Sequence, residues 1–340
     1  METDASLGAA EAEARTEELV SNIERLGAKI QSVRAQINSV ILGQTEVVDD
    51  SLVTLLAGGH ALLVGVPGLA KTKLVETAGK ILGLSERRVQ FTPDLMPADI
   101  IGSEVLEESD TGQRDFRFIE GPVFSQLLMA DEINRASPRT QSALLQAMQE
   151  CRVSVAGRYH ALPTPFHVMA TQNPLEHEGT YPLPEAQLDR FLMQIDVGYP
   201  DRDSERRMMV STTGGEEAAP EQVMTAEDLQ AAQALVRRLP VGESVVEVIL
   251  AIVRAGRPET SDVSEVTEYV GWGPGPRASQ ALMLTCRARA LIDGRLSPSV
   301  DDVVALAKPV LQHRMGLKFT ARHSGVGIDA IIELLCREFR

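Results

Sequence analysis

Lys71 and Thr72 are the residues of this chain whose types and setting point most directly to chemistry. They follow a turn of mostly small residues at 65–70, which joins a short apolar run at 61–64 to an apolar-periodic segment. A buried strand, a glycine-rich loop and a helix in this order form a phosphate-binding loop, in which backbone N–H groups and the helix N-terminus hold a polyphosphate. Lys71 would then reach the β- and γ-phosphates, and the Thr72 hydroxyl would ligate Mg²⁺. The loop residues expected to hold the nucleotide are Gly65, Pro67, Gly68, Leu69, Ala70, Lys71 and Thr72.

Ala70 stands where the pattern G-x-x-x-x-G-K-[ST] has its second glycine. An alanine is unstrained only with a negative φ, so an unstrained loop requires Ala70 to stay out of the left-handed region. The alternative for the whole stretch is an ordinary strand-to-helix turn with Lys71 exposed beside it.

Two carboxylates, Asp131 and Glu132, end a later apolar run, and Asn173 follows the next one. Asp131 can hold Mg²⁺ beside the Thr72 hydroxyl, while Glu132 can polarise a water for in-line attack on the γ-phosphoryl group. Asn173 can hydrogen-bond that water or a γ-phosphate oxygen. Each also fits a plainer role, as a solvated acid at a strand end or as a turn residue before a proline.

Two arginines are candidates for stabilising transition-state charge on a phosphoryl group. Arg190, if it lies at a subunit edge, would act on the nucleotide of a neighbouring subunit. Its alternative is an ion pair with Glu185 or Asp189. Arg277 begins a predicted helix in the second half of the chain and could reach the phosphates from there. The alternative is a solvated cation at the helix start, which the positive end of the helix dipole slightly disfavours.

Strands and helices alternate over the first two hundred residues, and the polar candidates follow the strands. This order predicts an α/β fold whose functional site lies at the carboxyl ends of a parallel sheet. Two stretches, 102–119 and 152–162, predict hairpins. The candidate strands lie at 61–64, 89–91, 126–132, 166–171 and 193–197.

Composition divides the chain into four parts. Residues 1–16 are rich in Ala and Glu and are predicted to form a disordered tail. Residues 17–205 form the predicted nucleotide-binding domain, beginning with an amphipathic helix. Residues 206–225 are predicted as a linker or hinge, and residues 226–340 as an all-α domain. The helices of that last part are expected at 226–239, 243–256, 276–293, 298–313 and 325–339.

Composition also argues against several functional classes. The 340-residue chain has a net charge of −15 and only 4% aromatic residues, which disfavours a general nucleic-acid binder. No apolar run reaches the ~18 residues of a membrane span, and the N-terminus lacks the basic and apolar regions of a signal peptide. The 3 cysteines have no metal-ligand spacing and fit a reducing compartment. We therefore expect a cytoplasmic protein without a membrane span.

Taken together, these residues make the chain resemble the MoxR family of AAA+ ATPases, over about residues 17–320. The family's usual alanine before the lysine accounts for Ala70. The resemblance implies an AAA+ domain with a five-stranded parallel sheet between helices, followed by a helical lid. It is carried by four stretches: Gly65–Thr72, Ala130–Ala136, Ala170–Pro174 and Gly179–Phe191.

The same resemblance implies a role for each matched residue. Lys71 and Thr72 would be Walker A, Asp131 and Glu132 Walker B, Asn173 sensor 1, Arg190 the arginine finger and Arg277 sensor 2. Ile41, Gly43 and Gln44 would line the adenine. The segment 93–121 would contain the helix-2 insert and 152–162 the pre-sensor-1 hairpin, both facing a pore or a partner.

Members of the family are similar to chaperone-like remodelling motors that bind ATP and Mg²⁺ and assemble as hexameric rings. They commonly work with a protein carrying a von Willebrand factor A domain. Arg277 would couple γ-phosphate loss to movement at a hinge near 201–225. Three alternatives stay open: a nucleotide-dependent switch with little turnover, a chelatase-like metal-insertion partner, and a DNA-dependent motor, which the charge opposes. Arg135 and Arg139 are further candidates for the arginine that acts between subunits.

Overall fold

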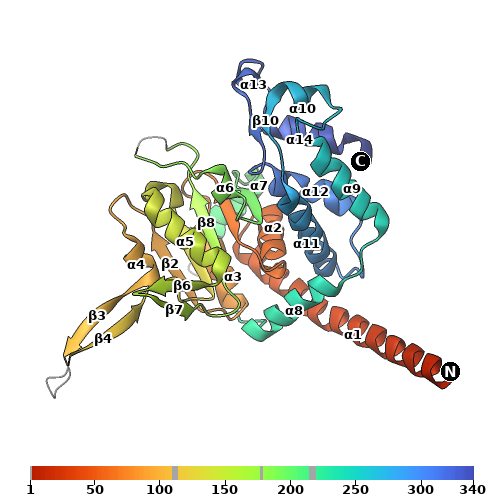
Figure 1. Cartoon of the computed structure of the whole chain (residues 1–340), viewed down its shortest axis with the longest axis horizontal. Helices are drawn as coiled ribbons and strands as arrows, with labels where there is room; N and C mark the ends of the chain where they lie inside the picture. Colours follow the sequence, from red (N-terminus) through yellow and green to blue (C-terminus); the bar gives the residue numbers. More distant parts are fainter. Residues whose placement is uncertain (1, 109–113, 177–178, 214–219) are drawn as a thin grey trace.

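A five-stranded parallel sheet is the centre of the N-terminal half of the molecule (Figure 1). The computed structural model describes residues 2–108, 114–176, 179–213 and 220–340. The sheet has the order β2-β5-β8-β1-β9, and every neighbouring pair runs parallel. The predicted α/β class is therefore confirmed. The strands are β1 (Ala61–Val64), β2 (Glu86–Gln90), β5 (Leu127–Asp131), β8 (His167–Gln172) and β9 (Met193–Asp196).

Alternate residues of the central strands face two separate apolar layers. Leu63 of β1 and Met129 of β5 belong to one cluster, while Leu62 and Ala130 belong to the other. Strands covered on both faces appear in a sequence as continuous apolar runs, which is why these strands could be predicted. The helices of this half are α1 (Glu2–Val40), α2 (Thr45–Leu56), α3 (Lys71–Ile81), α4 (Pro97–Ile101), α5 (Pro138–Glu150), α6 (Glu185–Leu188) and α7 (Arg202–Thr213). Helices α1 to α3 belong to the first cluster, and α5 belongs to the second.

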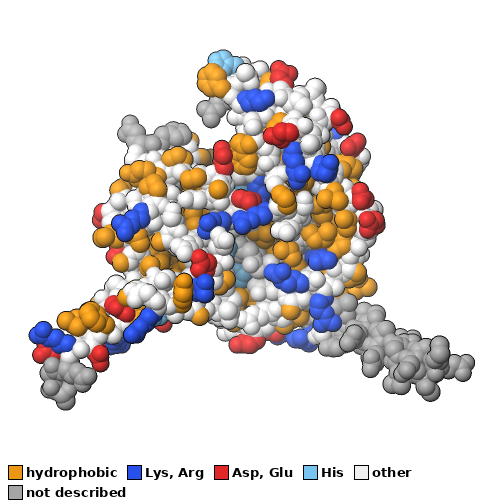
Figure 2. All heavy atoms as spheres, viewed as in Figure 1, with side chains coloured by type: hydrophobic (Ala, Val, Ile, Leu, Met, Phe, Trp, Pro, Cys, Tyr) orange, Lys and Arg blue, Asp and Glu red, His pale blue; other side chains and the backbone are white. Residues whose placement is uncertain are grey.

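Both predicted hairpins are present. They are β3 (Gly102–Glu108) with β4 (Arg114–Glu120), and β6 (Arg152–Val155) with β7 (Arg158–Ala161). The predicted turn at 109–112 lies outside the described residues. The β3–β4 hairpin projects from the body and exposes hydrophobic side chains (Figures 1 and 2), among them Phe116, which is 68% exposed. Its base contacts the second hairpin, because the Phe118 ring stacks on His160 with centroids 3.9 Å apart.

The C-terminal part is a helical lid. Its helices are α8 (Ala226–Arg238), α9 (Glu243–Ala255), α10 (Ser264–Tyr269), α11 (Pro276–Ile292), α12 (Val300–Leu311), α13 (Phe319–His323) and α14 (Ile328–Cys336). The expectation of an all-α domain needs one correction, because β10 (Val270–Trp272) pairs antiparallel with β11 (Gly316–Leu317). Strands of three and two residues are too short to show the alternation that a sequence pattern can detect.

Two segments of the predicted domain division differ from the structure. Helix α1 begins at Glu2, so residues 2–16, expected as a disordered tail, are helical. Ala and Glu dominate this stretch and are strong helix formers. Part of the expected linker at 206–225 is also helical, since α7 continues to Thr213, while residues 214–219 lie outside the described part. Of the helices described, including the long α1, none combines the length and apolar character needed to cross a bilayer.

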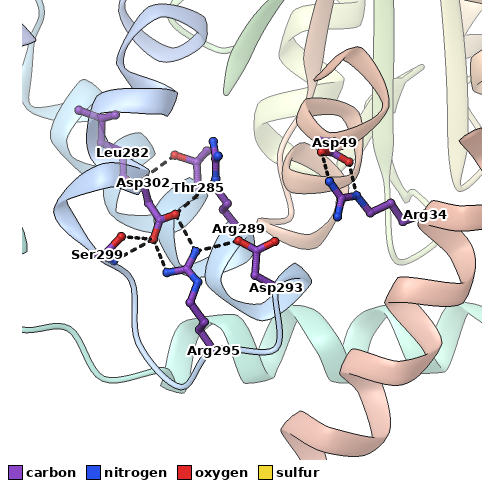
Figure 3. Close-up of polar contacts among 9 residues, drawn as sticks. All are labelled: Arg34, Asp49, Leu282, Thr285, Arg289, Asp293, Arg295, Ser299 and Asp302. Atoms are coloured by element: carbon purple, nitrogen blue, oxygen red, sulfur yellow. Dashed lines mark hydrogen bonds and ion pairs between the residues drawn. The ribbon is translucent and has the colours of Figure 1, made fainter. Parts of the chain in front are cut away.

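Helix α1 joins the two halves of the molecule. It packs against α2 and α3 of the sheet domain and against α8 and α11 of the lid. Lys29 of α1 forms an ion pair of 2.5 Å with Asp228 of α8, and Arg34 donates to both carboxylate oxygens of Asp49 in α2 (Figure 3). One apolar cluster continues from these helices into the lid. The halves therefore share a packed interface in addition to the connecting segment.

A buried carboxylate organises the lid itself. Asp302 on α12 is 3% exposed and accepts two hydrogen bonds of 2.7 Å from Arg295 (Figure 3). Arg289 of α11 lies 3.3 Å from the same carboxylate, and the Ser299 N–H donates to it at 2.8 Å. A buried charge is tolerated when it is paired and hydrogen-bonded in this way. These contacts fix α12 against α11.

Two buried histidines and the partly buried His60 are held neutral in the folded protein. His167 is 1% exposed and His313 is 3% exposed, and burial lowers the pKa of both. The neighbouring Arg314 lowers the pKa of His313 further, although the His313 ring lies 3.0 Å from the Phe191 carbonyl oxygen. Burial lowers the pKa of His60 to about 3.

Acidification below pH 6.5 is expected to remove stability that these histidines contribute. Their folded pKa values lie below the unfolded value near 6.5, so the unfolded state binds more protons as the pH falls toward the folded values. The loss is up to about 1.4 kcal/mol per pH unit for each histidine. Asp50 has the opposite effect on stability, because burial raises its pKa to about 7 and the folded state therefore binds its proton more tightly than the unfolded state.

A comparison of variants separates the contribution of His313 to the pH dependence of stability from the contribution of Asp50. His313→Gln keeps a donor for the carbonyl but cannot be protonated. Between pH 7 and 5 the midpoint of its thermal unfolding should fall less than that of the unmodified protein. His323→Gln, at an exposed position, should follow the unmodified protein. Equal shifts for His313→Gln and the unmodified protein would contradict the neutral assignment.

Candidate active site

The loop after β1 enters α3 at Lys71, whose amine lies over the loop's own backbone. Lys71 Nζ donates hydrogen bonds to the carbonyl oxygens of Gly65 at 2.6 Å and Val66 at 2.8 Å. Burial lowers the pKa of Lys71, while the carboxylates of Asp131 and Glu132 act to raise it. Lys71 is therefore close enough to both carboxylates to be attracted by their negative charges.

Ala70 adopts the conformation that an unstrained alanine would avoid. Its φ of 56° lies in the left-handed region, whereas the sequence required a negative value for an unstrained loop. Gly68, two residues earlier, has a φ of 85° and open space beside it. Left-handed residues turn nearby N–H groups toward a common point, which is how an anion-binding nest forms. The strain at Ala70, about 1–2 kcal/mol, therefore lies in the loop that would hold a phosphate.

Asp131 ends β5 and faces this loop across a cavity of about 420 Å³. The Thr171 hydroxyl of β8 donates to Asp131 Oδ1 at 2.5 Å, and Arg88 of β2 donates to Oδ2 at 2.6 Å. Thr72 lines the same cavity, so its hydroxyl and the Asp131 carboxylate are both available as oxygen ligands for a divalent cation.

Glu132 is held in a strained backbone conformation. Its φ of 54° and ψ of 50° are left-handed, and its N–H donates to the Thr171 hydroxyl at 2.8 Å. Its carboxylate accepts hydrogen bonds from Gln90 at 2.8 Å and from Arg135 at 3.0 Å. Left-handed backbone at a non-glycine residue persists only where the surroundings enforce it, and it concentrates at functional sites. The strain and the two donors fix the direction of this carboxylate.

Most of the predicted residues line this one cavity. Asn173 does so, is 6% exposed, and accepts a hydrogen bond of 3.1 Å from the Leu175 N–H, which also makes it the turn residue of the plainer alternative. Gly65 does not line the cavity. A Cβ there would lie 2.5 Å from the Val197 carbonyl oxygen, so this glycine allows the loop to approach the end of β9. The predicted residues that line it are Pro67, Gly68, Leu69, Ala70, Lys71, Thr72, Asp131, Glu132 and Asn173.

A second cavity of about 740 Å³ contains two of the three residues predicted for the adenine, Gly43 and Gln44. Gln44 Nε2 lies 3.4 Å from the Leu69 carbonyl oxygen, which connects this cavity to the phosphate loop. Gly43 has a φ of 75°, and a Cβ there would lie 2.4 Å from Ser204. Ile41 needs a correction: its side chain is 2% exposed and packs into the apolar core instead of lining the cavity.

Arg190 and Arg277 lie together in a third cavity, of about 290 Å³, away from Lys71. Arg190 donates to the Leu145 carbonyl oxygen of α5 at 2.6 Å. Arg277 lies 3.7 Å from Asp189, whose carboxylate also accepts a 2.7 Å hydrogen bond from the buried Arg314. Arg190 thus contacts α5, and Asp189 pairs with other arginines. The structure places Arg277 beside Arg190, not over the phosphates of its own loop.

Comparison with known proteins identifies the family of the chain. The model of the ATPase family associated with various cellular activities (AAA) matches residues 60–193, and that of the AAA lid domain matches residues 264–334. The chain is 41% identical to Chaperone MoxR1 of Mycobacterium tuberculosis, over 91% of this chain and 82% of that protein. The chain belongs to the MoxR family of AAA+ ATPases. It is also 30% identical to Protein MoxR of Paracoccus denitrificans, over 87% of this chain and 91% of that one. A solved structure from Cytophaga hutchinsonii superposes with a TM-score of 0.87 at 35% identity, covering 96% and 98% of the two chains.

Several residues of this MoxR-family site were missed from the sequence. Arg88 and Gln90 occupy alternate positions of β2 and reach the two carboxylates at the end of β5. Thr171 bonds both Asp131 and Glu132, yet the sequence shows it only as part of an apolar run. Two exposed polar residues spaced by two on a strand next to the one that ends at Asp131 are the signal that could have identified β2.

Proposed function

We propose that this MoxR-family ATPase hydrolyses ATP with Mg²⁺ and uses the energy to remodel or mature protein clients in a hexameric homo-oligomer. The observation that supports this best is the separation of the hydrolytic groups onto two surfaces of one chain. Lys71 and Glu132 line one cavity, while Arg190 and Arg277 line another. A complete set forms where the arginine surface of one subunit meets the phosphate-loop cavity of the next.

The residues of the first cavity fit ATP and Mg²⁺. Lys71 donates to loop carbonyls, which anionic phosphate oxygens would replace with stronger charge-assisted hydrogen bonds. The open space beside Gly68 leaves room for a phosphate against the loop backbone. Thr72 and Asp131 would hold Mg²⁺, which neutralises charge on the phosphates.

The chain's own groups would then carry out the hydrolysis. Glu132 accepts a proton from the attacking water, and Asn173 orients that water or a γ-phosphate oxygen. Arg190 and Arg277 of the neighbouring subunit stabilise the charge that develops on the transferred phosphoryl group. Arg135 is the weaker candidate for this role, because it already bonds Glu132 within its own chain.

The client and partner assignments rest on the family. The name of the relative MoxR1 supports a chaperone-like role. The projecting β3–β4 hairpin offers apolar side chains to a client or to a partner with a von Willebrand factor A domain, in the cytoplasm. A chelatase-like role in metal insertion would differ only in the client.

Turnover measured against protein concentration, with molecular mass recorded at each point with and without ATP, tests the proposal. Specific activity should rise by about tenfold or more as monomers assemble, because the arginines act only between subunits. Flat or absent turnover in a protein that stays monomeric would favour the nucleotide-dependent switch. DNA that stimulates turnover in a salt-sensitive way would favour the DNA-dependent motor.

A further inference from the structure

We propose that Gln141 is a positioning residue for Glu132, acting through the backbone turn that follows it. The proposal rests on the proposed hydrolytic role of Glu132. Gln141 lies in the first turns of α5 and is 0% exposed. It is not among the residues that line the phosphate-loop cavity, so its effect must be transmitted by its neighbours.

The Gln141 side-chain amide holds three backbone carbonyls. Its Nε2 donates to the oxygens of Ile133 at 3.2 Å, Ala136 at 3.2 Å and Tyr181 at 3.0 Å. The two hydrogens of one NH₂ group serve all three acceptors. Its Oε1 has no partner among the described residues, and a buried unsatisfied acceptor has a cost in folding free energy. A buried amide that accepts this cost is better explained by the position it enforces than by stability.

Two of these carbonyls bracket the turn that follows Glu132. The 3₁₀ turn η1 (Ile133–Arg135) starts directly after the left-handed Glu132. The Arg135 N–H donates to the Glu132 carbonyl oxygen at 2.9 Å, and the Arg135 side chain bonds the Glu132 carboxylate. Holding the oxygens of Ile133 and Ala136 therefore fixes both ends of the segment that orients the carboxylate.

The third carbonyl connects this turn to the segment that leads to Arg190. The Tyr181 N–H donates to the Asn134 carbonyl oxygen at 2.7 Å, while the Tyr181 carbonyl accepts from Gln141. The chain then continues through α6 to Arg190, which bonds the Leu145 carbonyl one turn further along α5. Helix α5 thus contacts the base turn of its own site and the arginine offered to the next subunit.

Gln141→Met tests the proposal because it keeps the length of the side chain and removes both donor hydrogens. We expect kcat to fall by about 10²-fold, since a catalytic group displaced by ~1 Å loses that much. The KM for ATP and the affinity for a fluorescent ATP analogue should stay within about twofold, because the phosphate loop is untouched. Gln146→Met is the matched control, as this glutamine lies on the exposed face of the same helix, and it should keep full turnover.

A double variant separates positioning from a general structural effect. If Gln141 acts through Glu132, then Gln141→Met added to Glu132→Gln should lower the residual turnover no further. Near-normal kcat in Gln141→Met, or additive losses in the double variant, would overturn the proposal.

If Gln141→Met does not bind the analogue, Gln141→Asn replaces it. The asparagine side chain is one methylene too short to reach all three carbonyls. Failure of both to bind would assign Gln141 to the fold alone and also overturn the proposal. If Glu132→Gln itself turns over normally, the base assignment fails, and that result is distinct from a failure at Gln141.

Discussion

Replacing Glu132 with glutamine should abolish most ATP turnover while leaving ATP bound. Glutamine has nearly the same shape, and its carbonyl oxygen can still accept hydrogen bonds from Gln90 and Arg135. It cannot take a proton from the attacking water, so the loss of general-base catalysis should lower kcat by roughly 10²–10⁴-fold. Lys71 and Thr72, which would hold the phosphates and Mg²⁺, are unchanged.

Phosphate release and the binding of a fluorescent ATP analogue, measured on the same preparation, check this result. Glu76→Gln makes the same chemical change at an exposed position of α3 and should turn over normally. Unchanged turnover in Glu132→Gln would eliminate Glu132 as the base. A loss of ATP binding would instead show that the Glu132 carboxylate helps to hold ATP before the reaction.

The location of the candidate residues around Lys71 could be predicted from the sequence because it depends on local sequence patterns. A strand followed by a glycine-rich turn places Lys71 at a helix start, and an apolar run that ends in Asp131 places a carboxylate at a strand end. In a parallel sheet all such ends meet at one edge, so no knowledge of strand order was needed to bring the two together. Asn173 follows by the same argument.

The residues that hold this site could not be predicted, because they depend on which strands are neighbours. The strand order does not follow the chain, and only the pairing of β2 with β5 brings Gln90 to Glu132 and Arg88 to Asp131. Gln141 was equally hidden, since a glutamine in an amphipathic helix is normally solvated. The burial of its amide is a property of the packed α5.

Ala70 shows a different limit of sequence reasoning. Intrinsic preference predicts a negative φ for alanine, and the loop imposes a positive one. Glu132 has the same backbone conformation. Local preference therefore fails at two positions of the candidate site, which is where strain is expected to be stored.

The position of Arg277 differs from the expectation, and its role as a sensor stays a prediction. Arg277 was expected to reach the phosphates of its own chain across a hinge, but it lies beside Asp189 and Arg190. Helix α1 packs against both halves, and an apolar cluster runs between them. In a chain arranged in this way, we propose that ATP binding and hydrolysis act chiefly on the contacts with neighbouring subunits. This proposal requires Arg190 to act between chains.

Replacing Arg190 with alanine should leave ATP binding intact and lower assembly-dependent hydrolysis by about 10³-fold or more. The Lys71 cavity does not contain Arg190, so the ground-state contacts of ATP are unaffected. In the isolated chain the guanidinium donates to the Leu145 carbonyl, a neutral acceptor that a neighbour's phosphate would displace. Arg254→Ala, at an exposed position of the lid, is the control for removing an arginine.

Mixing two inactive variants decides whether Arg190 acts between subunits. Lys71→Ala keeps Arg190 but loses the phosphate site, and Arg190→Ala keeps the phosphate site but loses the arginine. In randomly mixed rings about a quarter of the interfaces would join an intact site to an intact arginine, so turnover should exceed the sum of the two variants measured separately. If mixed rings are shown by mass to form and turnover does not exceed that sum, Arg190 does not act in trans. The intersubunit role would then have to be sought at Arg277, which lies in the same cavity, or at Arg139.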